Sequence, residues 1–187
     1  VRIVTLLENK YYNFNGLNLS IETIDGLVKH NGRVENQNNF NNILGKKIFK
    51  DKINFLKNPS LEAQIASISD DIAYNSHDLE DGLRAKLYTI EDLKNIPVLS
   101  KIINKHKKFI KLKGNELVLR QIIRSIINEM VNDIILNTKK NLKKQKINSI
   151  KNIYNSKTLL VSFSKEMEAF DISIKSFLRE RMYFSKN

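Results

Sequence analysis

Apolar positions recur at intervals of three and four residues through most of the chain, and lysine and asparagine fill many of the positions between them. This period is typical of an amphipathic α-helix, in which residues three and four apart lie on one face. The longest periodic run predicts a helix over residues 115–137, and another predicts a helix over residues 164–183. Only two prolines and six glycines interrupt the 187 residues. The pattern therefore predicts an all-α fold with few tight turns.

Residues that favour helix ends mark three shorter helices. Ser20 precedes a periodic run that ends near Gly32, which predicts a capped helix between them. Thr89 precedes a second short run, and Pro97 marks the start of a lysine-rich helix over residues 98–113. These positions divide the chain into helices of ordinary length.

The first third of the chain is less regular. Residues 1–9 are rich in apolar side chains, which suits either a buried helix or a strand, and residues 11–16 have the composition of a turn. Residues 33–58 are rich in asparagine and lysine, so we expect a long loop with a short helix around residues 40–49.

The densest acidic and polar stretch of the chain lies between Pro59 and Gly82. Pro59 and Ser60 predict the start of a helix, and Gly82 predicts its end. The apolar positions that should face a core are Ile65, Ala66, Ile68, Ile72 and Ala73.

Asp70, Tyr74 and Asp78 follow one another at intervals of four along this predicted helix, so they share one face, and His77 lies beside them. Two carboxylates and a phenol beside an imidazole are able to bind a metal ion or a polar ligand. A solvated acidic helix face explains the same pattern, and the residues alone leave both interpretations open.

Charge adds a second open question. Lysine and arginine outnumber aspartate and glutamate by 32 to 20, and the net charge of +12 suggests an anionic partner such as a nucleotide, nucleic acid or a membrane surface. An AT-rich coding bias towards lysine, asparagine and isoleucine explains the excess equally well. One lysine run suits either a solvated helix end or a nucleic-acid patch: Lys139, Lys140, Lys143, Lys144, Lys146 and Lys151.

Several classes of chemistry are excluded. There is no cysteine, so disulfides, thiolate metal sites and cysteine nucleophiles are absent. No apolar run approaches the ~20 residues that span a bilayer, so we expect a cytoplasmic protein. No phosphate-binding loop, dinucleotide motif or zinc-protease motif occurs, and His30, His77 and His106 are too dispersed for a local zinc motif.

Three blocks carry a resemblance to a known family. They are GLNLSIETIDGLVKHNG (residues 16–32), SLEAQIASISDDIAYNSHDLEDGLRA (residues 60–85) and RQIIRSIINEMVNDII (residues 120–135). Together they resemble bacterial deoxyguanosinetriphosphate triphosphohydrolase-like proteins, which are HD-domain dNTP triphosphohydrolases, and the opening RIVTLLE and closing FLRERMY are similar to the same family. Lys86 stands where the family pattern has glycine.

The resemblance implies an HD-domain-like helical bundle that is incomplete at the N-terminus. We expect residues 1–95 to be the C-terminal part of the phosphohydrolase core and residues 96–187 to be a helical region that packs on it. The expected chemistry converts a dNTP and water into a deoxynucleoside and triphosphate at a divalent metal such as manganese or magnesium.

The resemblance also implies roles for particular residues. Asp70 matches the last ligand of the family's H…HD…D metal set, and Tyr74 and Asp78 match positions that contact the nucleotide sugar. Arg120 or Arg124 is placed to meet the phosphates, by a looser match. Asp71 is expected to support the metal ligand or to form a salt bridge.

The histidines and the His-Asp pair of the metal set lie upstream of RIVTLLE in the family, as does the expected acid or base, so we expect no catalytic residue in this chain. A single aspartate is a poor ligand set for a transition metal. We therefore expect that the isolated chain neither holds the metal tightly nor hydrolyses dNTPs. Its expected partners are a deoxynucleoside triphosphate and either further copies of itself or an N-terminal polypeptide. A helical interaction or regulatory module, or a basic nucleic-acid-binding protein, are the alternatives.

Overall fold

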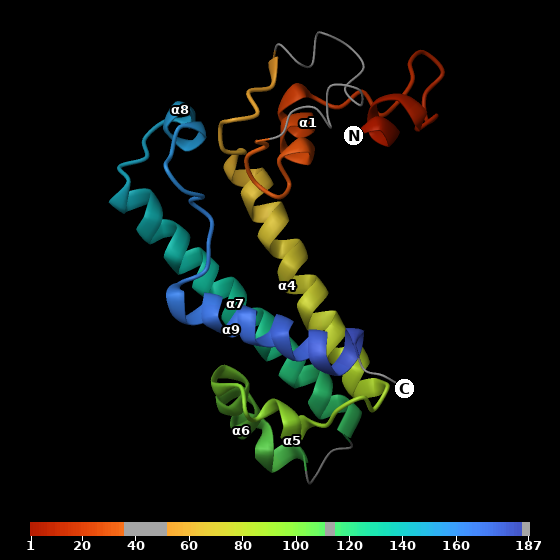
Figure 1. The fold of residues 1–187 in the computed structure, drawn as a ribbon, viewed down its shortest axis with the longest axis vertical. Coiled ribbons are helices and arrows are strands. Elements are labelled where there is room, and N and C mark those ends of the chain that lie inside the picture. Colours follow the sequence, from red (N-terminus) through yellow and green to blue (C-terminus); the bar gives the residue numbers. More distant parts are fainter. Residues whose placement is uncertain (36–51, 111–114, 185–187) are drawn as a thin grey trace. The chain divides into compact units, whose positions relative to one another are not determined.

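The computed structural model describes residues 1–35, 52–110 and 115–184. Within these ranges the regular elements are α-helices and two π-helical turns, and no β-strand is present (Figure 1). The predicted all-α class is therefore confirmed. The short helix predicted around residues 40–49 lies outside the described residues.

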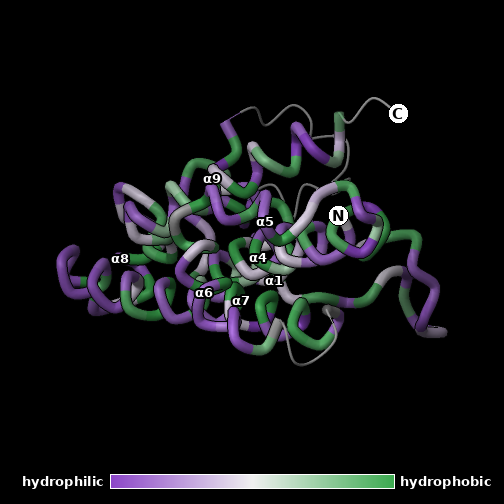
Figure 2. The backbone as a smooth tube through the Cα atoms, turned by 90° about the horizontal axis from the view of Figure 1, so that it is seen from below, coloured by the Kyte–Doolittle hydropathy of each residue, from purple (hydrophilic) through white to green (hydrophobic). Residues whose placement is uncertain are grey.

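The elements follow one another as expected from the caps and the apolar period. In chain order they are η1 (Ile3–Leu7), α1 (Ile21–Val28), α4 (Leu61–Arg84), α5 (Ile90–Leu93), α6 (Pro97–Ile110), α7 (Asn115–Lys144), α8 (Ile150–Tyr154), α9 (Lys165–Leu178) and η2 (Arg179–Tyr183). Hydrophobic and hydrophilic positions alternate along the helices in short stretches rather than in blocks, as amphipathic helices require (Figure 2).

The chain divides into two compact units. Residues 1–68 and 141–161 form the first, and residues 69–140 and 162–187 form the second. The division expected after residue 95 remains a prediction.

The first unit has a small apolar core and a buried polar tie. Ile24 and Val28 of α1 pack with Ile53 and Phe55. A buried glutamine near the start of α4, Gln64, satisfies three backbone groups. Its Nε2 donates to the Pro59 carbonyl at 2.9 Å, while its Oε1 accepts from the amides of residues 160 and 161 at 2.8 and 3.1 Å.

The second unit holds the larger core. Apolar side chains from the second half of α4 and from α5, α6, α7 and α9 are buried in it: Ile72, Leu79, Leu93, Leu99, Ile102, Ile103, Ile122, Ile126, Met130, Phe170, Ile174 and Leu178. Polar contacts join neighbouring helices at its edges, as between His106 of α6 and Ser125 of α7, where Nε2 and Oγ lie 3.0 Å apart.

The predicted caps are confirmed. The side-chain oxygens of Ser20, Ser60 and Thr89 accept from backbone amides of the first turns of α1, α4 and α5, and Ser164, which was not predicted as a cap, does the same for α9. Thr89 forms a reciprocal capping box with Asp92. Local sequence therefore determines where these helices begin.

The helix predicted between Pro59 and Gly82 does not end where expected. Gly82 lies inside α4, which continues to Arg84, because glycine here makes room for a tyrosine ring rather than ending the helix. The left-handed residue after the helix is Lys86, with φ of +60°, a conformation that glycine adopts more readily than other residues.

Two expectations of burial are also wrong. Ile65 is 49% exposed and Ala66 is exposed, although the period of α4 suggested that both face a core. Within residues 1–9 the helical turn η1 forms at Ile3–Leu7, but Ile3 and Leu7 are exposed rather than buried. Periodicity identifies the faces of a helix but does not say which face is covered.

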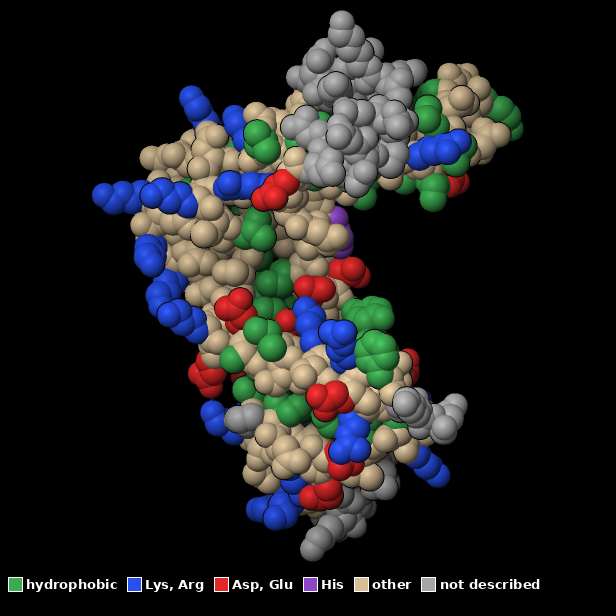
Figure 3. Space-filling model, in the orientation of Figure 1, with side chains coloured by type: hydrophobic (Ala, Val, Ile, Leu, Met, Phe, Trp, Pro, Cys, Tyr) green, Lys and Arg blue, Asp and Glu red, His purple; other side chains and the backbone are tan. Residues whose placement is uncertain are grey.

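The lysine-rich stretch is in large part helical. The helix α7 runs to Lys144, beyond the predicted end at residue 137, and lysines gather on the surface over its C-terminal half (Figure 3). None of the helices in the described ranges is long and apolar enough to cross a membrane.

Candidate functional site

The second half of α4 carries the three aligned candidates. Because an α-helix turns about 100° per residue, Asp70, Tyr74 and Asp78 lie about 40° apart around its axis. Asp70 is exposed, Tyr74 is 60% exposed, and Asp78 is half-buried. The helix thus presents all three side chains on neighbouring lines of one face.

Tyr183, from the end of η2, joins two of these candidates. Its hydroxyl donates to Asp78 Oδ2, and it also forms a side-chain hydrogen bond with Tyr74. Partial burial and these hydrogen bonds raise the pKa of the Tyr183 phenol well above its usual value. The phenol therefore stays protonated, and remains a donor, at neutral pH.

The backbone beneath Asp78 is held by a second tyrosine. The Tyr88 hydroxyl is 3.2 Å from the carbonyl oxygens of both Asp78 and Leu79. Its ring packs edge-on against Phe177 of α9 with 4.8 Å between centroids. A Cβ at Gly82 would lie 2.3 Å from the Tyr88 hydroxyl, so the close approach requires glycine. Burial, followed by the nearby carboxylates, raises the pKa of the Tyr88 phenol.

Asp71 forms the expected salt bridge. Its Oδ2 lies 3.4 Å from Nζ of Lys175, which is also 2.9 Å from Oδ2 of Asp171. The Asn75 side chain donates to the other Asp171 oxygen at 2.8 Å, and both of these residues are buried. Burial alone would lower the pKa of Lys175, but its two carboxylate partners outweigh that effect and raise it. This network fixes α9 against α4 beside the candidate face.

The described residues do not form a complete metal site. No group of three His, Asp or Glu side chains within the described ranges is arranged to hold a metal ion. Asp70 contributes one exposed carboxylate, His77 is exposed about two turns further along α4, and His106 contacts Ser125. The described residues can therefore supply one metal ligand, Asp70, but not a complete set of ligands.

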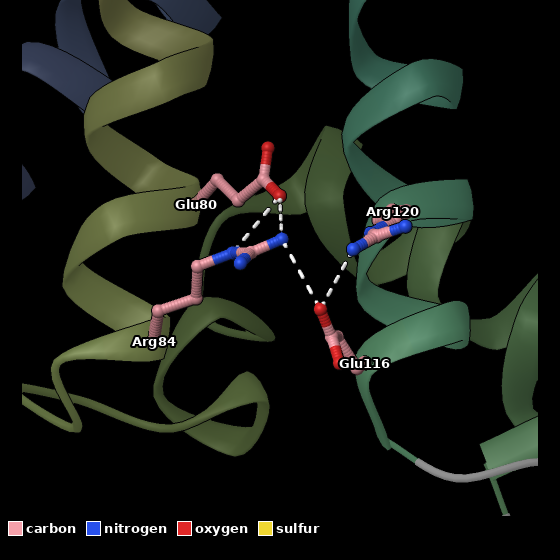
Figure 4. Close-up of polar contacts among 4 residues, drawn as sticks. All are labelled: Glu80, Arg84, Glu116 and Arg120. Carbon is pink, nitrogen blue, oxygen red and sulfur yellow. Dashed lines mark hydrogen bonds and ion pairs between the residues drawn. The ribbon is translucent and has the colours of Figure 1, made fainter.

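The structure places Arg120 in a chain of ion pairs between α4 and α7 (Figure 4). Arg120 Nη2 donates to Glu116 Oε1 at 2.8 Å, and Arg84 Nη2 lies 3.5 Å from the same oxygen. Arg84 also pairs with Glu80 at 2.8 Å. Arg124, one turn further along α7, is exposed.

This chain of ion pairs lies away from the aligned candidates. Glu80 and Arg84 are about 200° and 240° around α4 from Asp78, on the opposite side of the helix. Glu116 and Arg120 meet that opposite side. The structure brings Tyr74, Asp78 and Tyr183 together, and it does not bring Arg120 to them.

A separate groove of about 770 Å³ lies in the first unit. Residues of α1, the start of α4 and α8 line it, among them Leu27, His30, Glu62, Ile150 and Tyr154. It contains none of the candidates predicted from the sequence.

Tyr183 is the residue that sequence reasoning missed. It lies 105 positions from Asp78, and nothing local in FLRERMY identifies a partner on another helix. Tyr88 was also missed, although it follows Asp78 by only ten positions and the nearby Gly82 was a signal of close packing.

Comparison with known proteins gives relatives along the whole chain. A "Deoxyguanosinetriphosphate triphosphohydrolase-like protein" of Pelagibacter ubique (strain HTCC1062) is 47% identical over 186 residues, which cover 100% of this chain and 50% of that protein. Proteins with the same name from Bartonella tribocorum and Brucella ovis are 38% and 37% identical, over 98% and 100% of this chain.

The chain spans about half the length of the curated relatives it matches, with 47% and 48% of the Bartonella and Brucella proteins covered, and it corresponds to their C-terminal part. No family model matches the chain.

Proposed function

We propose that this chain, which is homologous over its whole length to the C-terminal part of deoxyguanosinetriphosphate triphosphohydrolase-like proteins, forms one wall of a dNTP triphosphohydrolase active site. The reaction adds water to a dNTP and releases a deoxynucleoside and intact triphosphate. The other wall, with the remaining metal ligands and the acid or base, is supplied by residues outside this chain.

The observation that carries this proposal is the face of α4 that presents Asp70, Tyr74 and Asp78. The relatives of the chain are named as triphosphohydrolase-like proteins, which gives this face a candidate substrate. Asp78 offers a carboxylate that accepts a hydrogen bond from a hydroxyl of the deoxyribose. Tyr74, at 60% exposure, offers a ring and a hydroxyl beside the same sugar. Tyr183 holds the two together, so both groups are positioned before the nucleotide arrives.

Asp70 is proposed as one carboxylate ligand of a divalent metal such as manganese or magnesium. Such a metal lowers the pKa of a bound water and neutralises charge on a phosphate. One exposed carboxylate does not hold a transition metal on its own. The isolated chain is therefore proposed to bind metal weakly and to lack turnover.

Of the two arginines, Arg124 is the better candidate for a phosphate contact. Both side chains are exposed on α7, but the guanidinium of Arg120 already forms an ion pair with Glu116. We expect Arg124→Ala to raise the KM for dGTP about tenfold, as loss of one charge-assisted hydrogen bond would. Equal KM values for Arg124→Ala and wild type would remove Arg124 from the site.

The test is to supply the active-site residues that this chain lacks. The chain is combined with the N-terminal half of the Pelagibacter ubique relative, and release of deoxyguanosine from dGTP is followed with manganese present. We expect turnover from the combination and none from the chain alone. Turnover by the purified chain alone would refute the proposal that the site is shared.

Two variants make this assay specific. Asp70→Asn removes the proposed ligand and should reduce turnover by more than a hundredfold, an order-of-magnitude expectation for loss of a metal ligand. Glu168→Gln removes an exposed carboxylate at the start of α9 and should leave turnover unchanged. Equal activity of the two variants would exclude Asp70 as a ligand.

A further inference from the structure

The groove of the first unit combines apolar side chains with two carboxylates. Exposed apolar side chains line it from three helices: Leu27 of α1 at 46% exposure, Ala66 of α4, and Ile150 of α8 at 71% exposure. Glu22 and Glu62 line the same groove. This combination suits an amphipathic helix, which packs apolar side chains into a groove and keeps basic ones at its flanks.

The walls of the groove are held together without a partner. Gly26 lets α1 approach α4 closely, since a Cβ at this position would lie 3.0 Å from the Cβ of Ala63. The buried Lys29 directly follows α1, and its Nζ lies 2.6 Å from Asp25 and 5.9 Å from the centroid of the Tyr154 ring of α8. The groove is therefore formed before anything binds in it, which lowers the cost of binding.

The groove borders the face of α4 that presents the proposed metal ligand. Ala66 precedes Asp70 by one turn, about 6 Å along the helix axis and about 40° around it. The ligands of one metal ion all lie within about 2–3 Å of that ion. A polypeptide that brings further ligands to Asp70 must therefore pass over this face of α4, one turn from the groove.

The curated relatives contain such a polypeptide. The match to the Pelagibacter ubique protein covers 50% of it, so as much chain again lies outside the matched part. Because the match corresponds to the C-terminal part, the remainder is the N-terminal half. That half is large enough both to fill the groove and to reach Asp70.

We propose that the groove lined by α1, the start of α4 and α8 is the docking surface for the N-terminal half of a deoxyguanosinetriphosphate triphosphohydrolase-like protein, in the same polypeptide or in a separate one. An amphipathic helix of that half packs its apolar side chains against Leu27, Ala66 and Ile150. Its basic side chains pair with Glu22 and Glu62. This inference rests on the proposed function, because the docked half supplies the other ligands of the same metal site.

The experiment co-expresses the 187-residue chain with a tagged N-terminal half of the Pelagibacter ubique relative. The complex is purified through the tag, and light scattering gives its stoichiometry. Dilution of the complex gives its dissociation constant, and release of deoxyguanosine from dGTP is followed in the same samples with manganese present. Amide hydrogen exchange is compared between the chain alone and the complex.

Two variants change the groove from different helices. Ala66→Arg places a long cationic side chain at an exposed helical position, where arginine is a good helix former. Ile150→Asp places a carboxylate at the first residue of α8, where the helix dipole favours it. The matched control is Ala169→Arg, at an exposed alanine of α9 that lies about 200° around the helix axis from Asp171. Circular dichroism checks that each variant is folded.

We expect a complex with one copy of each polypeptide, and slower hydrogen exchange in α1, the first half of α4 and α8 than in the chain alone. Ala66→Arg and Ile150→Asp should each weaken the complex at least about tenfold, the scale of losing a central interface contact. Ala169→Arg should bind as tightly as the wild type.

The outcomes separate this inference from the proposed function. A complex that turns over dGTP but is unaffected by both groove variants overturns the inference alone. So does a dimer of the chain by itself that Ala66→Arg dissociates, since the groove would then hold a second copy. A wild-type complex without turnover, weakened by both groove variants, contradicts the proposed function and leaves the docking surface in place. Absence of both complex and turnover overturns both.

Discussion

Gly82→Ala tests the packing that holds Asp78 in place. An added Cβ would lie 2.3 Å from the hydroxyl oxygen of Tyr88 and 2.5 Å from its ring carbons, far inside van der Waals contact. The Tyr88 ring must therefore move. Such a movement breaks its hydrogen bonds to the carbonyls of Asp78 and Leu79 and separates it from Phe177.

The expected cost follows from these contacts. Overpacking a core costs about 1–3 kcal/mol. A buried hydrogen bond contributes about 1 kcal/mol, and an aromatic pair about 0.5–1.5 kcal/mol. The better helix propensity of alanine offsets about 1 kcal/mol of this loss. We expect a net destabilisation of about 2 kcal/mol, which corresponds to a fall in Tm of about 4–8 °C for a chain of this size.

The measurement is urea and thermal unfolding followed by circular dichroism at 222 nm. Tyr88→Ala and the double variant complete a thermodynamic cycle. With the ring absent, Gly82→Ala should become neutral or stabilise the helix by up to about 1 kcal/mol. Equal destabilisation by Gly82→Ala in both backgrounds would refute the proposed contact.

Three further predictions follow from single contacts. Gln64→Leu should lower the free energy of unfolding by about 2–4 kcal/mol, because a buried carbonyl and two buried amides lose their hydrogen-bond partner. Urea unfolding measures this change, and a loss below about 0.5 kcal/mol would contradict the prediction. Lys175→Met should lower the same quantity by about 1–2 kcal/mol, because the nearly buried carboxylate of Asp171 loses its ion pair; an unchanged urea midpoint would argue that the pair contributes nothing. Folding raises the pKa of the Tyr88 phenol, so this phenol loses its proton at lower pH in the unfolded chain than in the folded one. The free energy of unfolding should therefore fall as pH rises above about 10. This fall should be shallower in Tyr88→Phe, and equal slopes in the variant and the wild type would count against burial of the phenol.

Helix starts could be predicted because they depend on a few neighbouring residues. Ser20, Ser60 and Thr89 each cap a helix by accepting a hydrogen bond from the amide three positions further along the chain. The family pattern also predicted the salt bridge at Asp71 as one of two outcomes. The caps need no knowledge of distant contacts, whereas Lys175, the partner of Asp71, lies 104 positions further along the chain.

Features decided by tertiary contact could not be predicted in this way. Gly82 follows the local rule for a helix end, yet the ring of Tyr88, which folds back onto α4 from beyond its end, explains the glycine. Ile65 follows the helical period, yet that face of α4 is exposed in this chain. Tyr183 reaches Asp78 across 105 positions of sequence, and a single sequence carries no signal for such a pair.

The most direct test of the central claim is the identity of the phosphate product. The chain combined with the N-terminal half of the Pelagibacter ubique relative is incubated with dGTP and manganese or magnesium, and ³¹P NMR follows the products. The proposed site predicts that intact triphosphate and deoxyguanosine are released in equal amounts. It also predicts that the Asp70→Asn variant releases neither product. Release of diphosphate or single phosphate in its place, or triphosphate release that Asp70→Asn does not alter, would contradict it.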